Sequence, residues 1–197
     1  GAHTRNAFFI EGFIDEAARA AGAEPLSFRM GMLGGNPRLA RCFQAAAARA
    51  GWNGGEPGSG QGIAGCSAFG SHAAIVAEAR LGADGRPKVD RIVAAIDAGR
   101  ILNPQIAVET VEGAIVHALG DALAQPFGYA AGEAMVRRLG ALGLPRAADL
   151  PVVEVELLPS EEAPGGLADL AVPPVAPAIA NALFAATGRR FRSLPFA

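Results

Sequence analysis

The sequence is poor in cysteine, in tryptophan and tyrosine, and in histidine. Its 197 residues include two cysteines, one tryptophan, one tyrosine and three histidines. Cys42 and Cys66 are far apart, and neither has a partner two to four residues away. The histidines, at positions 3, 72 and 117, are equally scattered. This spacing excludes the common zinc motifs, so we expect no metal site of that kind and two reduced structural thiols.

The sequence also lacks an excess of charge of either sign and any long apolar run. It has 17 basic and 19 acidic residues, a net charge of −2. There is thus no basic field for nucleic acid or anionic lipid, and we expect neither partner. No run reaches the roughly 18 apolar residues of a membrane span, so we expect none. Acidic residues interrupt the apolar stretch near the start, so we expect a cytoplasmic protein, or a periplasmic one if a longer precursor carries an export signal.

Glycine is abundant, but its arrangement does not form a nucleotide-binding motif. The chain has 26 glycines, and 51% of its residues are apolar, which can supply a core. The glycine-rich segment 54–65 lacks the strand-to-helix context of a phosphate-binding loop, so it is interpreted as a linker. Ser59, Ser67 and Ser71 have no evident base and orienter, and no nucleophile elbow is present, which argues against a hydrolase.

The first 51 residues have the pattern of a helical segment. Apolar residues at helical spacing predict a helix over residues 6–22, with Asn6 as its N-cap and Gly22 at its end. We expect its apolar side, with Ile10 and Phe13, to face the core, and Glu11, Asp15 and Arg19 to lie on the opposite side. Two further helices are predicted over residues 25–33 and 37–50.

After residue 51 the pattern changes to that of strands with interspersed helices. Residues 52–62 are predicted to be a loop that separates segment 1–51 from region 63–197, although the two could form one compact domain. Alternating runs over 75–81 and 88–96 predict an antiparallel hairpin. Asn103 and Pro104 predict the start of a long helix, and a strand is expected over 152–158. Residues 126–151 give no clear pattern. This order predicts an α+β fold, with a helical N-terminal segment and an antiparallel sheet with packed helices.

The most informative segment is the C-terminal run of residues 165–190. It reads Gly-Gly-Leu-Ala-Asp-Leu-Ala-Val-Pro-Pro-Val-Ala-Pro-Ala-Ile-Ala-Asn-Ala-Leu-Phe-Ala-Ala-Thr-Gly-Arg-Arg. A single acid, Asp169, thus stands on a loop stiffened by glycine and proline. A helix is predicted to begin at Pro177, whose fixed φ suits a first helical position, and to end at Gly188.

This run resembles the C-terminal signature of the molybdopterin-binding large subunits of the xanthine dehydrogenase and aldehyde oxidase family. The family pattern is Gly-Gly-x-Gly-Glu-x-Gly-x-Pro-Pro-x-Ala-Pro-Ala-x-Ala-Asn-Ala, and the similarity is greatest to the isoquinoline 1-oxidoreductase branch. Ordered matches extend over essentially the whole chain. They include Phe13-Ile14-Asp15-Glu16, Pro25-Leu26-Ser27-Phe28-Arg29, Asp97-Ala98-Gly99-Arg100, Asn103-Pro104, Glu112-Gly113 and Arg192-Ser193-Leu194-Pro195.

The resemblance implies a molybdenum hydroxylase fold and chemistry. The implied reaction is oxidation of an aldehyde or an N-heterocycle with oxygen derived from water, with a carboxylate as base. By motif position Asp169 is the catalytic residue, and Thr110, Ala168 and Gly166 contact the molybdenum–pterin cofactor. Implied partners are the remainder of the large subunit, a small subunit with iron–sulfur clusters and a small-molecule substrate. The cofactor-cradling Gln-Gly segment of the family is absent from these 197 residues, so we expect no activity from the chain alone.

Three positions depart from the family pattern. Asp169 stands where the family has Glu, Ala168 where it has Gly, and Thr110 where it has Gln. Shortening the acid by one methylene retracts the carboxylate by about 1 Å, and a misplacement of that size can lower a rate by about 10²-fold. The sequence therefore leaves three alternatives: a catalytic C-terminal portion, a degenerate scaffold or assembly module of the same family, or an unrelated α+β binding domain.

Overall fold

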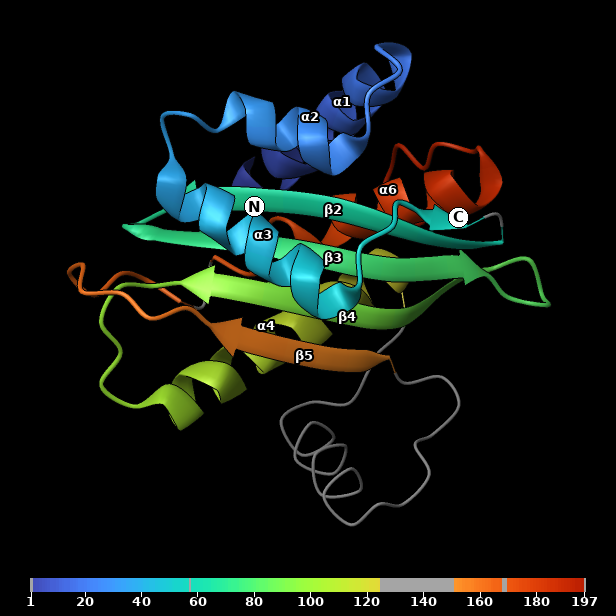
Figure 1. The fold of residues 1–197 in the computed structure, drawn as a ribbon. Coiled ribbons are helices and arrows are strands. Elements are labelled where there is room, and N and C mark those ends of the chain that lie inside the picture. Colours follow the sequence, from blue (N-terminus) through green and yellow to red (C-terminus); the bar gives the residue numbers. More distant parts are fainter. Residues whose placement is uncertain (1, 57, 125–150, 168–169, 197) are drawn as a thin grey trace.

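The computed structural model describes residues 2–56, 58–124, 151–167 and 170–196. Helices and strands alternate in blocks along the chain (Figure 1). Their order is α1 (Ala2–Ala20), α2 (Pro25–Met32), α3 (Pro37–Ala50), β1 (Gly55–Glu56), β2 (Ser59–Ala68), β3 (Ser71–Leu81), β4 (Pro87–Asp97), α4 (Pro104–Leu123), β5 (Val152–Leu157) and α6 (Val175–Thr187).

The strands form one mixed sheet in the order β1-β2-β3-β4-β5. β1 to β4 are antiparallel neighbours, whereas β5 runs parallel to β4. The predicted α+β class and the predicted hairpin, now β3 and β4, are confirmed. The sequence did not predict the parallel direction of β5. It is possible because α4 lies in the connection between the two strands, and a parallel pair needs such a crossover.

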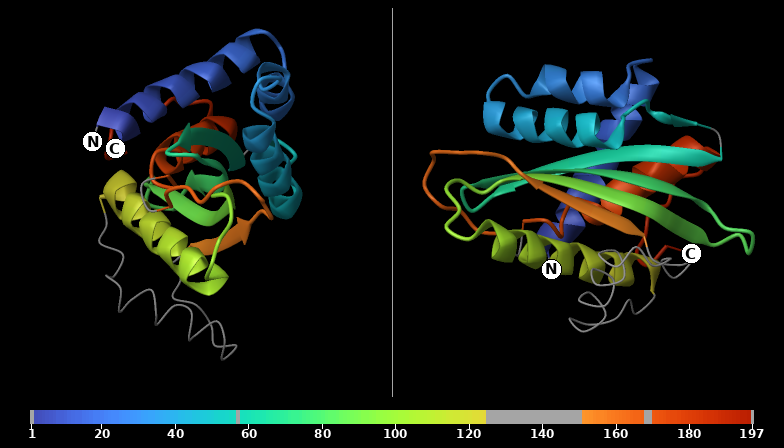
Figure 2. Two further views of the ribbon diagram at one scale, coloured as in Figure 1. Left: turned by 90° about the vertical axis from the view of Figure 1, so that its left-hand side faces the viewer. Right: turned by 60° about the horizontal axis from the view of Figure 1, so that its bottom comes forward.

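Helices cover both faces of the sheet (Figure 2). α3 packs against one face, over β3 and β4, while α6 and α4 lie on the other face. Because side chains alternate along a strand, β3 contributes to two cores. Its residues Ala73 and Ile75 belong to the core beneath α4 and α6, whereas Ala74 and Val76 pack against α3. The helical segment thus rests on the sheet, and the predicted division into 1–51 and 63–197 stays a prediction.

The interpretation of the glycine-rich segment as a linker is wrong. Residues 59–68 form β2, which pairs along its length with β3. The glycines are there because α6 lies directly on the backbone of this strand. A Cβ added to Gly60 would lie 1.8 Å from the carbonyl oxygen of Ala182, and one added to Gly62 would lie 2.1 Å from that of Ala178. The sequence shows that this segment has few side chains, but it does not show that a helix packs against it and requires their absence.

The predicted orientation of the first helix is also wrong. α1 begins at Ala2 rather than after Asn6, although Gly22 follows its end with a φ of +69° as expected. Its acidic side faces inward: Glu11 and Asp15 are 6% and 3% exposed, whereas Ile10 and Phe13 are 57% and 71% exposed. Acidic side chains usually face solvent, but these two can be buried because arginine side chains pair with both of them.

Asparagine side chains cap the starts of α3 and α4, and of these two caps the sequence predicted that of Asn103. Asn36 and Asn103 each accept a hydrogen bond from a backbone N–H at the start of α3 and α4, at 3.2 and 3.1 Å. α6 begins at Val175, two residues before the predicted start, and ends before Gly188, which has a φ of +73°. Of the segment 126–151, all but residue 151 lies outside the described residues.

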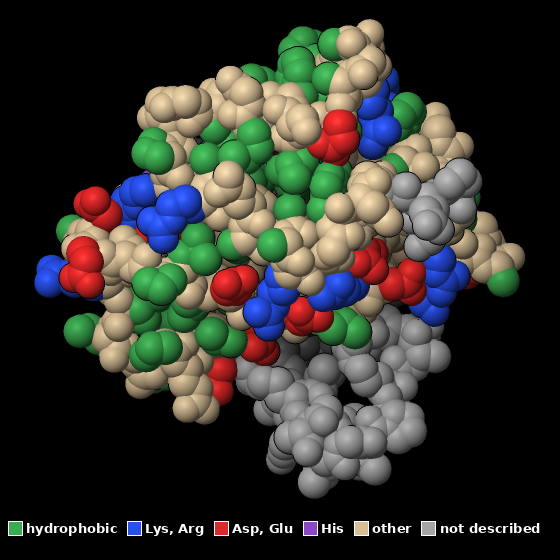
Figure 3. Space-filling model, viewed as in Figure 1, with side chains coloured by type: hydrophobic (Ala, Val, Ile, Leu, Met, Phe, Trp, Pro, Cys, Tyr) green, Lys and Arg blue, Asp and Glu red, His purple; other side chains and the backbone are tan. Residues whose placement is uncertain are grey.

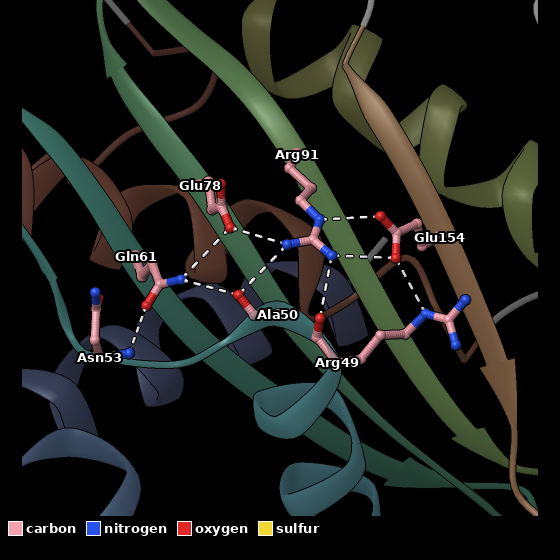
Figure 4. A network of polar contacts seen from close by, with 7 residues as sticks. All are labelled: Arg49, Ala50, Asn53, Gln61, Glu78, Arg91 and Glu154. Carbon is pink, nitrogen blue, oxygen red and sulfur yellow. Dashed lines mark hydrogen bonds and ion pairs between the residues drawn. The ribbon is translucent and has the colours of Figure 1, made fainter. Parts of the chain in front are cut away.

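A polar network ties the end of α3 to the sheet (Figure 4). The Arg91 guanidinium on β4 donates hydrogen bonds to the carbonyl oxygens of Arg49 and Ala50, the last residues of α3, at 3.1 and 3.4 Å. The same guanidinium pairs with Glu154 of β5 at 3.0 Å and with Glu78 of β3 at 3.4 Å. The Gln61 side-chain amide also donates a hydrogen bond to the Ala50 carbonyl oxygen. Arg91 thus satisfies carbonyl groups that a helix end leaves unpaired.

The contact between β2 and α6 predicts a large effect of a single methyl group. Gly62→Ala should lower the free energy of unfolding by about 3 kcal/mol, because neither backbone can move without disturbing the sheet. The matched control is Gly31→Ala in α2, where nothing lies within 4 Å of the added Cβ. The control should gain about 0.5–1 kcal/mol. Urea denaturation measures both, and equal effects would contradict the close packing of α6.

Candidate functional site

The candidate site centres on the loop between β5 and α6, residues 158–174, which we call the carboxylate loop. Its first half crosses the ends of β2, β3 and β4. The Gly165 N–H donates to the carbonyl of Ala98 at 2.9 Å, and the Gly166 N–H donates to that of Phe69 at 3.2 Å. The N–H of Arg100 donates to the Glu162 carbonyl at 2.9 Å. Backbone hydrogen bonds therefore fix the loop onto the sheet up to Gly166.

Glycines allow this close attachment. A Cβ on Gly165 would lie 2.2 Å from the Ser71 hydroxyl oxygen. Gly99 has a φ of +72°, and its Cβ would lie 2.1 Å from the Ala163 carbonyl oxygen. The Ser71 hydroxyl beneath Gly165 is buried and has no hydrogen-bond partner among the described residues. Gly165, a glycine of the predicted signature, thus allows the loop to pack closely against the sheet.

The second half of the loop is anchored by a cysteine. The Cys66 thiol donates to the carbonyl oxygen of Leu170 at 3.1 Å, and Leu170 is 1% exposed. Burial raises the pKa of the Cys66 thiol to about 12, and it does the same for Cys42. Both cysteines are unpaired, and these pKa values keep them protonated, as expected for structural thiols.

The structure places two of the four predicted site residues. Gly166 is exposed, and only the Phe69 side chain would lie near an added Cβ, at 3.4 Å. Thr110 lies in α4, where its hydroxyl donates to the carbonyl of Ile106 at 2.8 Å. Asp169 and Ala168 lie outside the described residues. Their neighbours Leu167 and Leu170 are described, and the Leu170 N–H donates to the Leu167 carbonyl at 3.2 Å.

An ion pair that the sequence pattern did not single out lies beside the carboxylate loop. Arg38 binds the Asp97 carboxylate through two nitrogens, at 2.7 and 3.0 Å, and the Gly99 N–H donates to the same carboxylate at 3.1 Å. The hydrogen bonds from Arg38 lower the pKa of Asp97 to about 2. A cavity of about 300 Å³ next to this pair is lined by Arg41 and by residues 159–162. The pair holds the turn to which the loop is bonded.

The expectation that Ser67 has no base nearby is wrong. Ser67 and His72 face each other across the β2–β3 hairpin, and the Ser67 hydroxyl lies 2.6 Å from His72 Nδ1. The turn between them, Phe69-Gly70, has positive φ at both residues, which explains the pairing. Asn36, which precedes α3, donates to the Ser67 hydroxyl at 3.1 Å. This cluster therefore lies on the α3 face, whereas Leu170 of the carboxylate loop packs on the other face.

The described residues contain neither a metal cluster nor a membrane-spanning helix. No group of three or more His, Cys, Asp or Glu side chains among them could hold a metal ion, and this part of the chain has no helix long and apolar enough to cross a membrane. On the face that carries α3, acidic and basic side chains lie side by side across β4 and β5 (Figure 3). Arg49 and Arg91 both pair with Glu154 there.

Comparison with known proteins agrees with the sequence resemblance. Residues 43–151 match the family model for the molybdopterin cofactor-binding domain. The chain belongs to this family. Over 193 residues it is 30% identical to the beta chain of isoquinoline 1-oxidoreductase from Brevundimonas diminuta, a match that covers 95% of this chain and 25% of that protein. It is 32% identical to a nicotinate dehydrogenase subunit of Pseudomonas putida, over 96% of this chain and 18% of that protein.

Among solved structures, the aldehyde oxidoreductase from Desulfovibrio desulfuricans matches with a TM-score of 0.46 at 20% identity. That match covers 64% of this chain and 14% of the other. The chain spans a quarter or less of the length of the curated relatives named above. It corresponds to one region of a molybdenum hydroxylase large subunit, which confirms the resemblance to the xanthine dehydrogenase and aldehyde oxidase family.

The Arg38–Asp97 pair predicts a pH-dependent stability. Because the pKa of Asp97 falls from 3.8 to about 2 on folding, the pair stabilises the protein above pH 4 and this stabilisation is lost as the pH falls toward 2. Asp97→Asn should be less stable by about 2 kcal/mol at pH 7, and the difference should shrink toward zero at pH 2. Urea denaturation at a series of pH values measures it. A difference that is constant with pH would contradict the assignment.

Proposed function

We propose that this chain forms one wall of the cofactor site in a molybdenum hydroxylase and supplies its proton acceptor, Asp169. The substrates would be aldehydes or N-heterocycles, the remainder of the large subunit would complete the site, and iron–sulfur clusters in a small subunit would receive the electrons. The observation that carries the proposal is the anchoring of the carboxylate loop at Gly165, Gly166 and Leu170, on both sides of Asp169. The cytoplasmic location expected from the sequence is part of the proposal.

We expect Gly166 and Thr110 to contribute to one side of a cofactor site rather than to form a complete cradle. Gly166 is exposed and has no side chain, so a planar group can approach its backbone. Its N–H is already used by Phe69, which leaves its carbonyl as the polar contact. The Thr110 hydroxyl donates within α4 and keeps only an acceptor function. These two residues would therefore hold the pterin by contact and by accepting hydrogen bonds, and donors must come from elsewhere in the large subunit.

When bound, the molybdenum cofactor supplies the redox centre at which a substrate carbon is oxidised. The role of this chain is to place a base. Asp169 would remove a proton as the oxygen derived from water attacks that carbon, and the loop's attachments to Ala98, Phe69 and Cys66 would hold its backbone in position. Position matters more than acidity here, because the aspartate arm is one methylene shorter than the family's glutamate.

A scaffold or assembly module without catalysis is the second candidate. Its support is the state of the contact residues: Thr110 and the Gly166 N–H are both engaged within the chain's own fold. Together with Asp in place of Glu and Ala168 in place of Gly, this is what a site that has lost its function would show. The two candidates differ in whether the cofactor is bound.

Elemental analysis separates the two candidates directly. The protein is purified from its source organism together with its native partners, and molybdenum is measured per copy of this chain. A ratio near one is expected for the hydroxylase. A metal-free complex that is otherwise intact would favour the scaffold.

Substitution of Asp169 tests the proposed base in the molybdenum-loaded complex. Asp169→Ala should abolish aldehyde or N-heterocycle turnover without changing molybdenum content. Asp169→Glu should raise kcat by up to about 10²-fold, because the longer arm restores the family's reach. The matched control is Asp121→Ala on α4, an exposed acid at 76% of its side-chain surface. Unchanged turnover in Asp169→Ala would remove this residue from the mechanism.

A further inference from the structure

The outer side of α1 has the features of a binding surface. Ile10 and Phe13 are exposed on it. In the left view of Figure 2, α1 lies along the outside of the molecule, with α6 on its inner side. A groove of about 220 Å³ runs beside it, between α1, α6 and the C-terminal segment. Apolar side chains on its walls alternate with polar ones: Phe13, Ala180 and Phe191 with Glu16, Asn181, Arg190 and Arg192. Exposed apolar side chains bordered by polar ones are typical of a protein-binding site.

Buried ion pairs hold α1 in this orientation. Arg190 contacts Asp15 and donates to the Asn181 side-chain oxygen at 3.0 Å. Asn181 in turn donates to the Ile63 carbonyl of β2 at 3.1 Å, so the connection reaches the sheet. On the α2 side, Arg29 pairs with Glu11.

This orientation has two costs for the chain in isolation. It takes two carboxylates out of water, and burial raises the pKa of Glu11 in consequence. At the same time it leaves a phenylalanine and an isoleucine in water. The ion pairs with Arg29 and Arg190 offset the first cost. The second cost disappears when another apolar surface covers Ile10 and Phe13.

We infer that the outer side of α1 and the adjoining groove bind an apolar segment from the remainder of a molybdenum hydroxylase large subunit. The inference rests on the proposed function. The relatives support this occupant: the match to the beta chain of isoquinoline 1-oxidoreductase includes 95% of this chain, yet it covers only 25% of that protein. The groove also carries a polar edge, the Glu16–Arg192 pair at 2.7 Å, which can align a segment that is otherwise apolar.

Photo-cross-linking from position 13 tests this assignment. Benzoylphenylalanine replaces Phe13 in the protein expressed in its source organism, the native complex is irradiated, and the cross-linked peptides are identified by mass spectrometry. We expect cross-links to a molybdopterin-subunit segment outside these 197 residues, in the same polypeptide or in a separate one. Cross-links to a second copy of this chain, to an unrelated protein or to nothing would overturn the inference.

A pair of substitutions shows whether the apolar surface carries the binding. Adding Ile10→Asp should reduce the cross-linked fraction about tenfold or more, the size of a typical loss at an interface centre. Leu102→Asp is the control, because Leu102 is an apolar residue 99% exposed on another part of the chain. Equal loss in both variants would count against the α1 surface. Molybdenum is measured on the same sample to distinguish the two proposals. Cross-links in a complex without molybdenum would contradict the proposed cofactor site but would still support the binding surface on α1.

Discussion

The contact between α6 and the backbone of β2 is the constraint on which the rest of this structure depends. Gly60 and Gly62 leave no side chains between the strand and the helix, so the Ala-rich side of α6 rests directly on the sheet. Asn181, buried in the middle of α6, fixes the register by bonding the Ile63 carbonyl. Because α6 follows the carboxylate loop, its position determines where the loop ends. The small residues of α6 within the C-terminal signature are therefore explained by packing, independently of any cofactor.

Two sets of contacts extend from this helix. Upstream, the carboxylate loop is bonded to the β2–β3 turn and to the turn after β4, where Arg38 and Asp97 form a buried pair. Downstream, Arg190 connects α6 to α1 through Asp15. A change in α6 would thus be felt both at the loop that carries Asp169 and at the surface of α1. This coupling gives the signature a structural role that a catalytic and a non-catalytic member of the family would share.

The family relationship and the catalytic role have different foundations. Membership follows from the matched domain and from ordered similarity along the chain. The catalytic role is a proposal, which rests on the position of one carboxylate and on a cofactor site that the remainder of a large subunit would complete. The described contacts show a loop held at both ends, and they also show that Thr110 and the Gly166 N–H are engaged within the fold. In the proposed function the chain supplies part of a site, and the chemistry of that site would depend on what completes it.

The sequence by itself determined the elements whose signals are local. The Asn caps of α3 and α4, the terminal glycines and the alternation in β3 and β4 act within a few residues, so the hairpin, most helices and the family signature could be predicted. Only the tertiary structure decided that a glycine-rich segment is β2, that α1 buries its acids, and that Ser67 meets His72. Each of these depends on a partner that is distant in the sequence or lies across a turn. The partners are the α6 backbone for β2, Arg29 and Arg190 for the acids of α1, and the opposing strand for Ser67. Such partners can reverse the structure that local polarity predicts, because burial and close packing depend on contacts between segments that are far apart in the sequence.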